Sequence, residues 1–149
     1  MSRPLHLILL HGLGADGDDL APVSDYLVDR VALPDHDWQV YRPDAPVAPV
    51  SINGGLAMPS WFDLVDDNGQ IDVDRDSLAR TTAALTAEIE ERVGDDPWIV
   101  GGFSQGGVLA TRLALGAKRP PLAAIMLSSW LAAPEQIEKP SDGRDPAVF

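Results

Sequence analysis

A glycine-rich segment between two apolar stretches constrains the fold of this 149-residue chain more than any other feature. The segment, residues 101–107, reads GGFSQGG. An apolar run over residues 98–100 precedes it, and an apolar-periodic stretch over residues 108–115 follows it. This order predicts a buried strand, a sharp turn and a helix. A strand and a helix pass closely at such a turn, which requires small residues two before and two after its central serine; Gly102 and Gly106 meet the requirement.

The Gly-x-Ser-x-Gly pattern makes Ser104 a candidate nucleophile. The turn would present its hydroxyl at the start of the helix, where backbone N–H groups and the helix dipole face a developing oxyanion. One alternative is a glycine-rich connection that only packs. Another is a phosphate-binding loop. That motif needs Lys followed by Ser or Thr directly after its last glycine, and here Val108 follows Gly107. The flanking strand and helix favour the nucleophile.

A second glycine-rich turn lies near the start of the chain. The apolar run at residues 7–10 leads directly into HGLGADG at residues 11–17. In α/β hydrolases the second oxyanion donor comes from a loop after an early strand, which often begins with His-Gly. Gly12 and Gly14 would let this backbone turn inward. A plain strand–helix turn is the alternative, but two such turns in one chain support each other.

Three segments together resemble the carboxylesterase/acyl-protein thioesterase (phospholipase/carboxylesterase) family of α/β hydrolases: residues 11–17, 43–63 and 101–107. The resemblance extends from about residue 5 to about residue 131. It implies an α/β-hydrolase fold, a small acyl ester or thioester substrate, an acyl-enzyme on Ser104 and no cofactor. It also implies that the backbone N–H groups of Leu13 and Gln105 form the oxyanion hole.

Two tryptophans are candidates for the substrate pocket. By resemblance to the family, Trp61 and its neighbours stand beside the active site and help to shape the acyl pocket. The alternative is that Trp61 and Phe62 only anchor their loop on the core. Trp130 follows the end of a predicted strand, and it either borders the pocket or simply packs.

The remaining sequence predicts one α/β domain over residues 1–149, with a mostly parallel sheet and helices on both faces. Expected strands are residues 5–10, 38–42, 97–101 and 122–127; expected helices are residues 20–31, 77–93 and 105–117. The middle helix has apolar residues on one face at helical spacing. Asp76 or Ser77 would cap its start, and Gly94 would end it.

Composition narrows the class of protein. The chain is 45% hydrophobic but contains no run of eighteen apolar residues, which excludes a membrane span. It has no cysteine, and residues 1–4 lead directly into a strand without the features of a signal peptide. The net charge of −12 argues against nucleic acid or an anionic membrane as partner and favours a cytoplasmic protein.

A metal site is not expected. Residues 72–76, DVDRD, match the first ligand spacings of an EF-hand loop, but Ser77 replaces the glycine of the sixth position and Ala83 the glutamate of the twelfth.

The catalytic base is the feature that the sequence lacks. A serine hydrolase of this fold needs its partners in the chain order Ser, acid, His. The three histidines, His6, His11 and His36, all precede Ser104. A rearranged triad that uses His11 is one alternative.

The acid is equally unusual. Residues 142–148 faintly resemble the family's His-Gly-x-x-Asp-Pro segment, which makes Asp145 the candidate. Asp142 stands where the family has histidine, and one residue fewer separates the glycine from the aspartate.

We therefore expect a partial α/β-hydrolase domain without its last strands, a helix and the catalytic histidine, as a fragment, a frameshift or an internal deletion would produce. Such a chain would be an inactive or weak serine hydrolase. The alternatives are a non-catalytic remnant that binds acyl groups or a protein partner, and a phosphate-binding α/β domain. The strand over residues 122–127 would be an unpaired sheet edge, which predicts a homodimer or edge-strand association.

Overall fold

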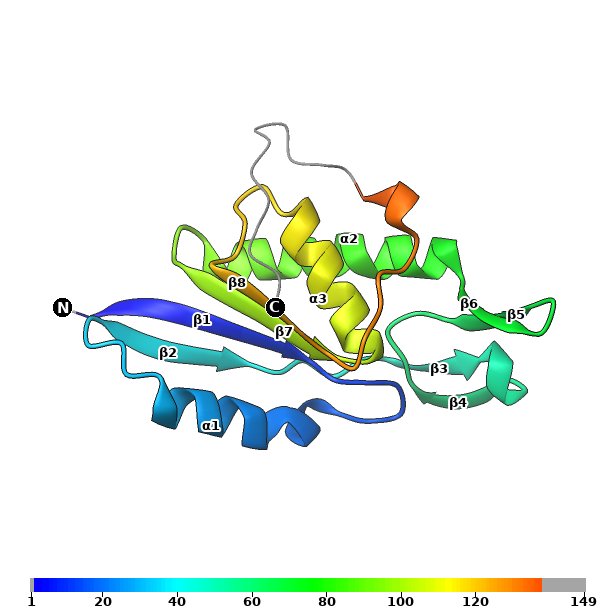
Figure 1. The fold of residues 1–149 in the computed structure, drawn as a ribbon, viewed down its shortest axis with the longest axis horizontal. Helices are drawn as coiled ribbons and strands as arrows, with labels where there is room; N and C mark the ends of the chain where they lie inside the picture. The colour runs from blue at the N-terminus through cyan, green and yellow to red at the C-terminus, as the bar shows by residue number, and fades with distance from the viewer. Residues whose placement is uncertain (1, 138–149) are drawn as a thin grey trace.

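The structure, a computed structural model, describes residues 2–137 and is built around a four-stranded parallel sheet (Figure 1). The strand order is β2-β1-β7-β8. The strands are β1 (Arg3–Leu10), β2 (His36–Tyr41), β7 (Trp98–Phe103) and β8 (Ala123–Leu127). The helices are α1 (Ala21–Arg30), α2 (Arg75–Val93) and α3 (Gln105–Gly116). Each of these elements lies within two residues of its predicted position, so the mostly parallel α/β sheet is confirmed.

The helices cover both faces of the sheet. Figure 1 shows α1 on one side and α2 with α3 on the other. Side chains of β1 alternate between the faces, as a strand's period of two requires. Leu7 and Leu9 pack with the residues of α1, whereas Ile8 and Leu10 belong to the larger core under α2 and α3. The apolar run at residues 7–10 is therefore buried on both faces.

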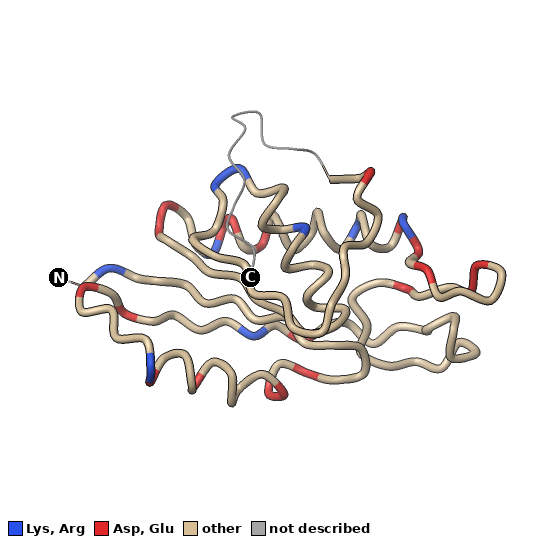
Figure 2. Tube along the Cα trace, viewed as in Figure 1, with Lys and Arg blue, Asp and Glu red and all other residues tan. Residues whose placement is uncertain are grey.

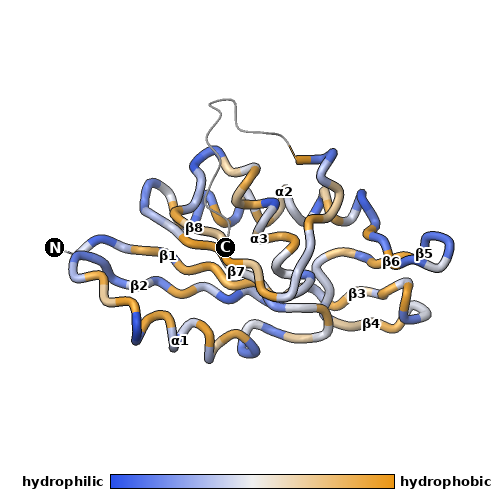
Figure 3. Tube along the Cα trace, viewed as in Figure 1, coloured by the Kyte–Doolittle hydropathy of each residue, from blue (hydrophilic) through white to orange (hydrophobic). Residues whose placement is uncertain are grey.

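Charge and hydropathy follow this layering. Figure 2 shows the acidic and basic residues on helices, turns and the outer parts of several strands, while β7 and β8 carry none. In Figure 3 the hydrophobic colour runs along β1, β7 and β8 through the middle of the molecule. No helix among residues 2–137 is long and apolar enough to cross a membrane.

The long connection between β2 and α2 contains two hairpins that the sequence reasoning missed. The first pairs β3 (Val47–Val50) with β4 (Leu56–Pro59), and the second pairs β5 (Leu64–Asp67) with β6 (Gln70–Val73). Both are antiparallel and separate from the main sheet. Three short 3₁₀ turns complete the described elements: Gly17–Leu20, Ser51–Asn53 and Pro134–Gln136.

The predicted start of α2 was wrong by two residues. Asp74, rather than Asp76 or Ser77, is the N-cap, and its carboxylate accepts the backbone N–H of Ser77 at 2.7 Å. This N–H is one of the first four in the helix, which have no partner inside it. The predicted end at Gly94 is confirmed, with φ of 53°.

Candidate active site

Ser104 forms the turn between β7 and α3. Its backbone angles are φ 51° and ψ −115°, a conformation that side-chain-bearing residues rarely adopt. Its N–H donates to the carbonyl of Leu127 in β8 at 2.9 Å, which ties the turn to the next strand. The sharp strand–helix turn predicted at this serine is therefore confirmed.

Glycine is required at two positions of this turn. A Cβ on Gly102 would lie 2.2 Å from the backbone carbonyl of Gly106. A Cβ on Gly106 would lie 2.0 Å from the carbonyl oxygen of Leu10, the last residue of β1. The head of α3 therefore packs directly on the ends of β1 and β7, and it can do so only without side chains.

The loop after β1 lies against the same turn. Leu10 is paired in register with Gly102, so the two strands end side by side. A Cβ on Gly12 would lie 3.1 Å from the Phe103 ring. Gly14, with φ of 76°, donates its N–H to the carbonyl of Pro59 at 2.8 Å, which fixes the loop. The two glycine-rich turns of the sequence thus meet at the carboxyl end of the sheet.

This arrangement determines where the two expected oxyanion donors lie. Gln105 is the first residue of α3, directly after Ser104, and Leu13 lies in the loop after β1. Within residues 2–137 neither backbone N–H has a hydrogen-bond acceptor. One N–H therefore belongs to the first residue of α3 and the other to the loop that lies against this turn.

The side chain of Gln105 joins α3 to the loop at residues 60–62, a role that the sequence did not suggest. It is 1% exposed. Its Oε1 accepts the N–H of Trp61 at 2.9 Å, while Nε2 donates to the carbonyl of Phe62 at 2.6 Å and to Ser60 Oγ at 3.2 Å. One buried amide thus holds three consecutive residues beside the candidate nucleophile.

His11 takes part in the same buried network. Its Nε2 accepts the N–H of Ala45 at 2.9 Å, so Nδ1 carries the hydrogen and donates to the carbonyl of Gly12 at 2.7 Å. The imidazole lies 5.1 Å from the Trp61 ring, measured between ring centroids. Both nitrogens are therefore engaged, which leaves neither to accept a proton from Ser104.

The other two histidines lie at the far end of the sheet. His6 is paired in register with Trp98, the first residue of β7, whereas Ser104 follows the last one. His6 Nε2 lies 3.7 Å from the carboxylate of Asp96. His36 is the first residue of β2. Parallel strands start at the same end, so neither histidine faces the serine.

The two candidate pocket tryptophans differ in exposure. Trp61 is 4% exposed, and its indole N–H donates to the carbonyl of His11 at 2.8 Å. This packing supports the role of a loop anchor, and its role as a pocket wall stays a prediction. Trp130 is 40% exposed and follows β8. The candidate acid, Asp145, lies outside the described residues.

Two contacts behind the turn were not predicted. Ser129 Oγ donates to the carbonyl of Ser104 at 2.7 Å. Arg112, the one charged residue of α3, is buried and donates to the carbonyls of Ala132 and Ala133 at 3.1 Å each. Burial lowers the pKa of this guanidinium. The one charge in a largely apolar helix was the signal that could have identified it.

No group of three or more metal-ligating side chains occurs among residues 2–137. The features near Ser104 are its own hydroxyl, the backbone N–H groups of Leu13 and Gln105, and a buried amide network. A strained serine at the head of a helix, on the carboxyl edge of a parallel sheet, defines the class of α/β hydrolases.

Comparison with known proteins identifies the family. The profile of the Phospholipase/Carboxylesterase family matches residues 4–144, so the chain belongs to that family, as predicted. Acyl-protein thioesterase 1 of Cryptococcus neoformans var. neoformans serotype D is 36% identical over 132 residues, which cover 84% of this chain and 54% of that protein. Acyl-protein thioesterase 1 of Saccharomyces cerevisiae is 30% identical over 142 residues, which cover 92% of this chain and 63% of that protein.

Solved structures agree with this assignment. Arabidopsis thaliana SOBER1 superposes with a TM-score of 0.80 at 26% identity, covering 97% of this chain and 71% of that one. Esterase PE8 has a TM-score of 0.69 at 28% identity, covering 99% of this chain and 66% of that one. The chain spans 54% to 63% of the length of the two curated relatives given above.

Proposed function

We propose that Ser104 is the nucleophile of a serine hydrolase that cleaves small carboxylic esters or thioesters. The observation that carries the proposal is its backbone conformation at the head of α3, near two N–H groups that have no acceptor within residues 2–137. Ser104 Oγ would attack the acyl carbon while the N–H groups of Leu13 and Gln105 stabilise the oxyanion. The alcohol or thiol leaves with a proton, and water then hydrolyses the acyl-serine to the acid. This chemistry needs no cofactor.

The same proposal includes weak or absent turnover by the 149-residue chain itself. The serine proton needs an acceptor, and all three histidines precede Ser104 in the sequence. His11 is committed to Ala45 and Gly12, and the other two histidines lie at the far end of the sheet. Asp145 is the proposed acid, and a base is the missing part.

Setting and partners follow from composition and from the sheet edge. The net charge of −12 and the lack of cysteine support a cytoplasmic location. The acidic charge also favours small acyl substrates over nucleic acid. Within residues 2–137, β8 is hydrogen-bonded to β7 alone. This edge supports pairing with a second copy of the chain or with another strand.

The first test is hydrolysis of a short p-nitrophenyl ester. The unaltered chain should retain the weak catalysis that an oxyanion hole and binding give without a triad, roughly 10³–10⁴-fold over water. Because this residual rate comes from binding and the oxyanion hole, Ser104→Ala should leave it within a few fold. Ser128→Ala is the matched control, because the φ of Ser128 is also positive, at 47°. Turnover by the unaltered chain like that of a complete esterase would contradict the weak-turnover part of the proposal.

The second test supplies the missing base. A hybrid would replace the residues after Leu131 with the corresponding part of yeast acyl-protein thioesterase 1. It should gain esterase activity and react with a fluorophosphonate at Ser104. A folded hybrid that stays inert and unlabelled would instead favour a non-catalytic remnant that binds acyl groups or a partner.

A further inference from the structure

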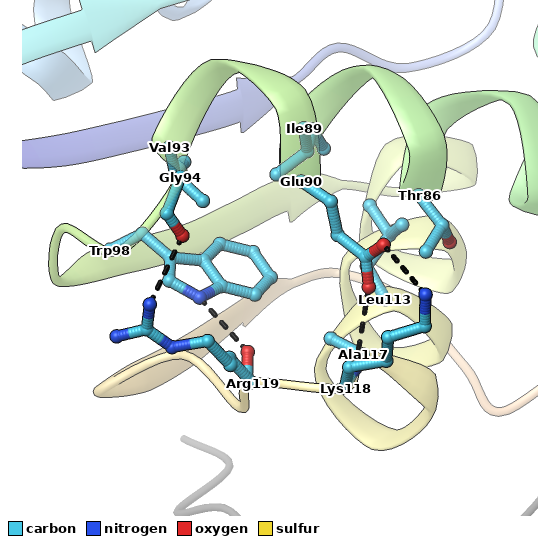
Figure 4. A pocket seen from close by; sticks show the side chains of 10 residues that line it. All are labelled: Thr86, Ile89, Glu90, Val93, Gly94, Trp98, Leu113, Ala117, Lys118 and Arg119. Carbon is cyan, nitrogen blue, oxygen red and sulfur yellow. Dashed lines mark hydrogen bonds and ion pairs between the residues drawn. The ribbon is translucent and has the colours of Figure 1, made fainter.

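An apolar pocket lies at the opposite end of the sheet from Ser104 (Figure 4). It has a volume of about 190 Å³ and is formed where the C-terminal ends of α2 and α3 meet the start of β7. Trp98 begins β7 and Phe103 ends it, so the strand separates the pocket from the serine by roughly 20 Å. The pocket is therefore distinct from the candidate active site.

The pocket walls are apolar. They consist mainly of Ile89 and Val93 from α2, Leu113 from α3, Ala117 directly after α3, and the Trp98 ring. Trp98 is 4% exposed, and its indole N–H donates to the carbonyl of Arg119 at 3.1 Å. Its one polar atom is thus satisfied, and the Thr86 hydroxyl, which also lines the pocket, donates to the carbonyl of Thr82 at 2.7 Å.

The charged residues at the pocket mouth neutralise one another. Glu90 accepts the backbone N–H of Lys118 at 3.4 Å and lies 3.8 Å from its ammonium (Figure 4). Arg119 pairs with Asp95 and donates to the carbonyl of Gly94 at 3.2 Å. Two acids are matched by two bases, and the chain as a whole is strongly acidic. The entrance therefore favours a neutral ligand over an anion.

We propose that this pocket binds a small neutral apolar molecule, about the size of one aromatic ring. An apolar cavity of roughly 150 Å³ elsewhere stays dry and binds benzene, so the volume here is sufficient for such a ring. Small residues leave the space open. Ala117 contributes only a methyl group, and α2 stops at Gly94.

Benzene is the probe, and the four tryptophan indole N–H signals of the ¹⁵N-labelled chain are the readout. The signal that disappears in Trp98→Phe should shift and saturate as benzene is added. The signal of Trp130, which is 40% exposed, should not move, because its ring lies outside the pocket. A Trp98 signal that never shifts, or equal shifts of all four signals, would overturn the proposal.

Variants locate the ligand independently. Ala117→Leu should fill the space and weaken benzene binding at least tenfold. In the control Ala87→Leu, at an exposed position of α2, the affinity for benzene should change by less than about twofold. Benzoate, the same ring with a charge, should bind more weakly than benzene. Unchanged affinity in Ala117→Leu, or tighter binding of benzoate, would refute the neutral apolar site. Ser104→Ala should bind benzene normally, which separates this result from the fate of the proposed hydrolase activity.

Discussion

Replacing Gln105 with alanine should destabilise the fold more than any exposed substitution. The change leaves the buried N–H of Trp61 without an acceptor, which costs about 1–3 kcal/mol. The carbonyl of Phe62 keeps its bond from Ser60 Oγ at 2.8 Å, so losing its second donor costs about 0.5–1.5 kcal/mol. A buried methylene adds about 0.8 kcal/mol. Together these losses should lower the free energy of unfolding by about 2–5 kcal/mol.

Urea and thermal unfolding followed by circular dichroism measure this loss. For a chain of this size the melting temperature should fall by roughly 5–15 °C. Gln39→Ala is the control, because Gln39 is exposed on β2, and it should change stability by less than about 0.5 kcal/mol. If Gln105→Ala were as stable as this control, the amide network would not hold the loop, and the reasoning would fail.

An isosteric change at the same position gives the network a pH dependence. In Gln105→Glu the introduced carboxyl must keep its proton to donate to the carbonyl of Phe62. Its folded pKa should therefore be raised above the ordinary value of about 4.3. Relative to the unaltered chain, the variant should be most stable below about pH 4 and should lose stability as pH rises through the raised pKa. A stability difference from the unaltered chain that stays constant between pH 4 and pH 7 would contradict this.

Three further predictions concern the turn and the helix cap. Gly106→Ala should prevent folding or cost about 3 kcal/mol or more by clash, whereas Gly116→Ala, with open space around it, should be neutral or stabilising by up to about 1 kcal/mol in urea unfolding. Asp74→Asn should remove the part of the pH dependence of stability that Asp74 causes. Its bond from the helix N–H lowers its pKa, so its contribution to the free energy of unfolding is present above about pH 4 and is lost as pH falls through the lowered pKa. Unfolding measured across an acid pH series would detect the difference. Ser129→Ala should cost about 0.5–1.5 kcal/mol in the same unfolding assay, because the carbonyl of Ser104 keeps its helix partners.

The main sheet and its helices could be predicted because their signals are local. Short apolar runs separated by stretches of helical periodicity predict parallel strands, whatever packs around them. The hairpin of β3 and β4 could not be predicted in this way, since its strands are four residues long and contain Pro49 and Pro59, which are unusual inside strands. The hairpin of β5 and β6 did carry a signal, Asn68-Gly69, with φ of 55° and 84°, and the pattern was overlooked.

The site shows the same division. The serine turn is coded by neighbours within two residues, so its geometry was predictable. The amide of Gln105 bonds to residues more than forty positions earlier, and His11 Nε2 accepts the N–H of a residue 34 positions later. Such partners become neighbours only after the sheet forms, and no periodicity or motif marks them. Long-range polar contacts therefore required the structure.

The conformation of Ser104 has a consequence for the stability of the whole chain. A serine held at φ 51° and ψ −115° carries strain of about 1–3 kcal/mol. Glycine would adopt the same angles without that strain, since it has no Cβ. A domain optimised only for folding would therefore have glycine at position 104. Under the proposed function, serine here trades stability for a nucleophilic hydroxyl, in a chain whose total stability is on the order of 10 kcal/mol.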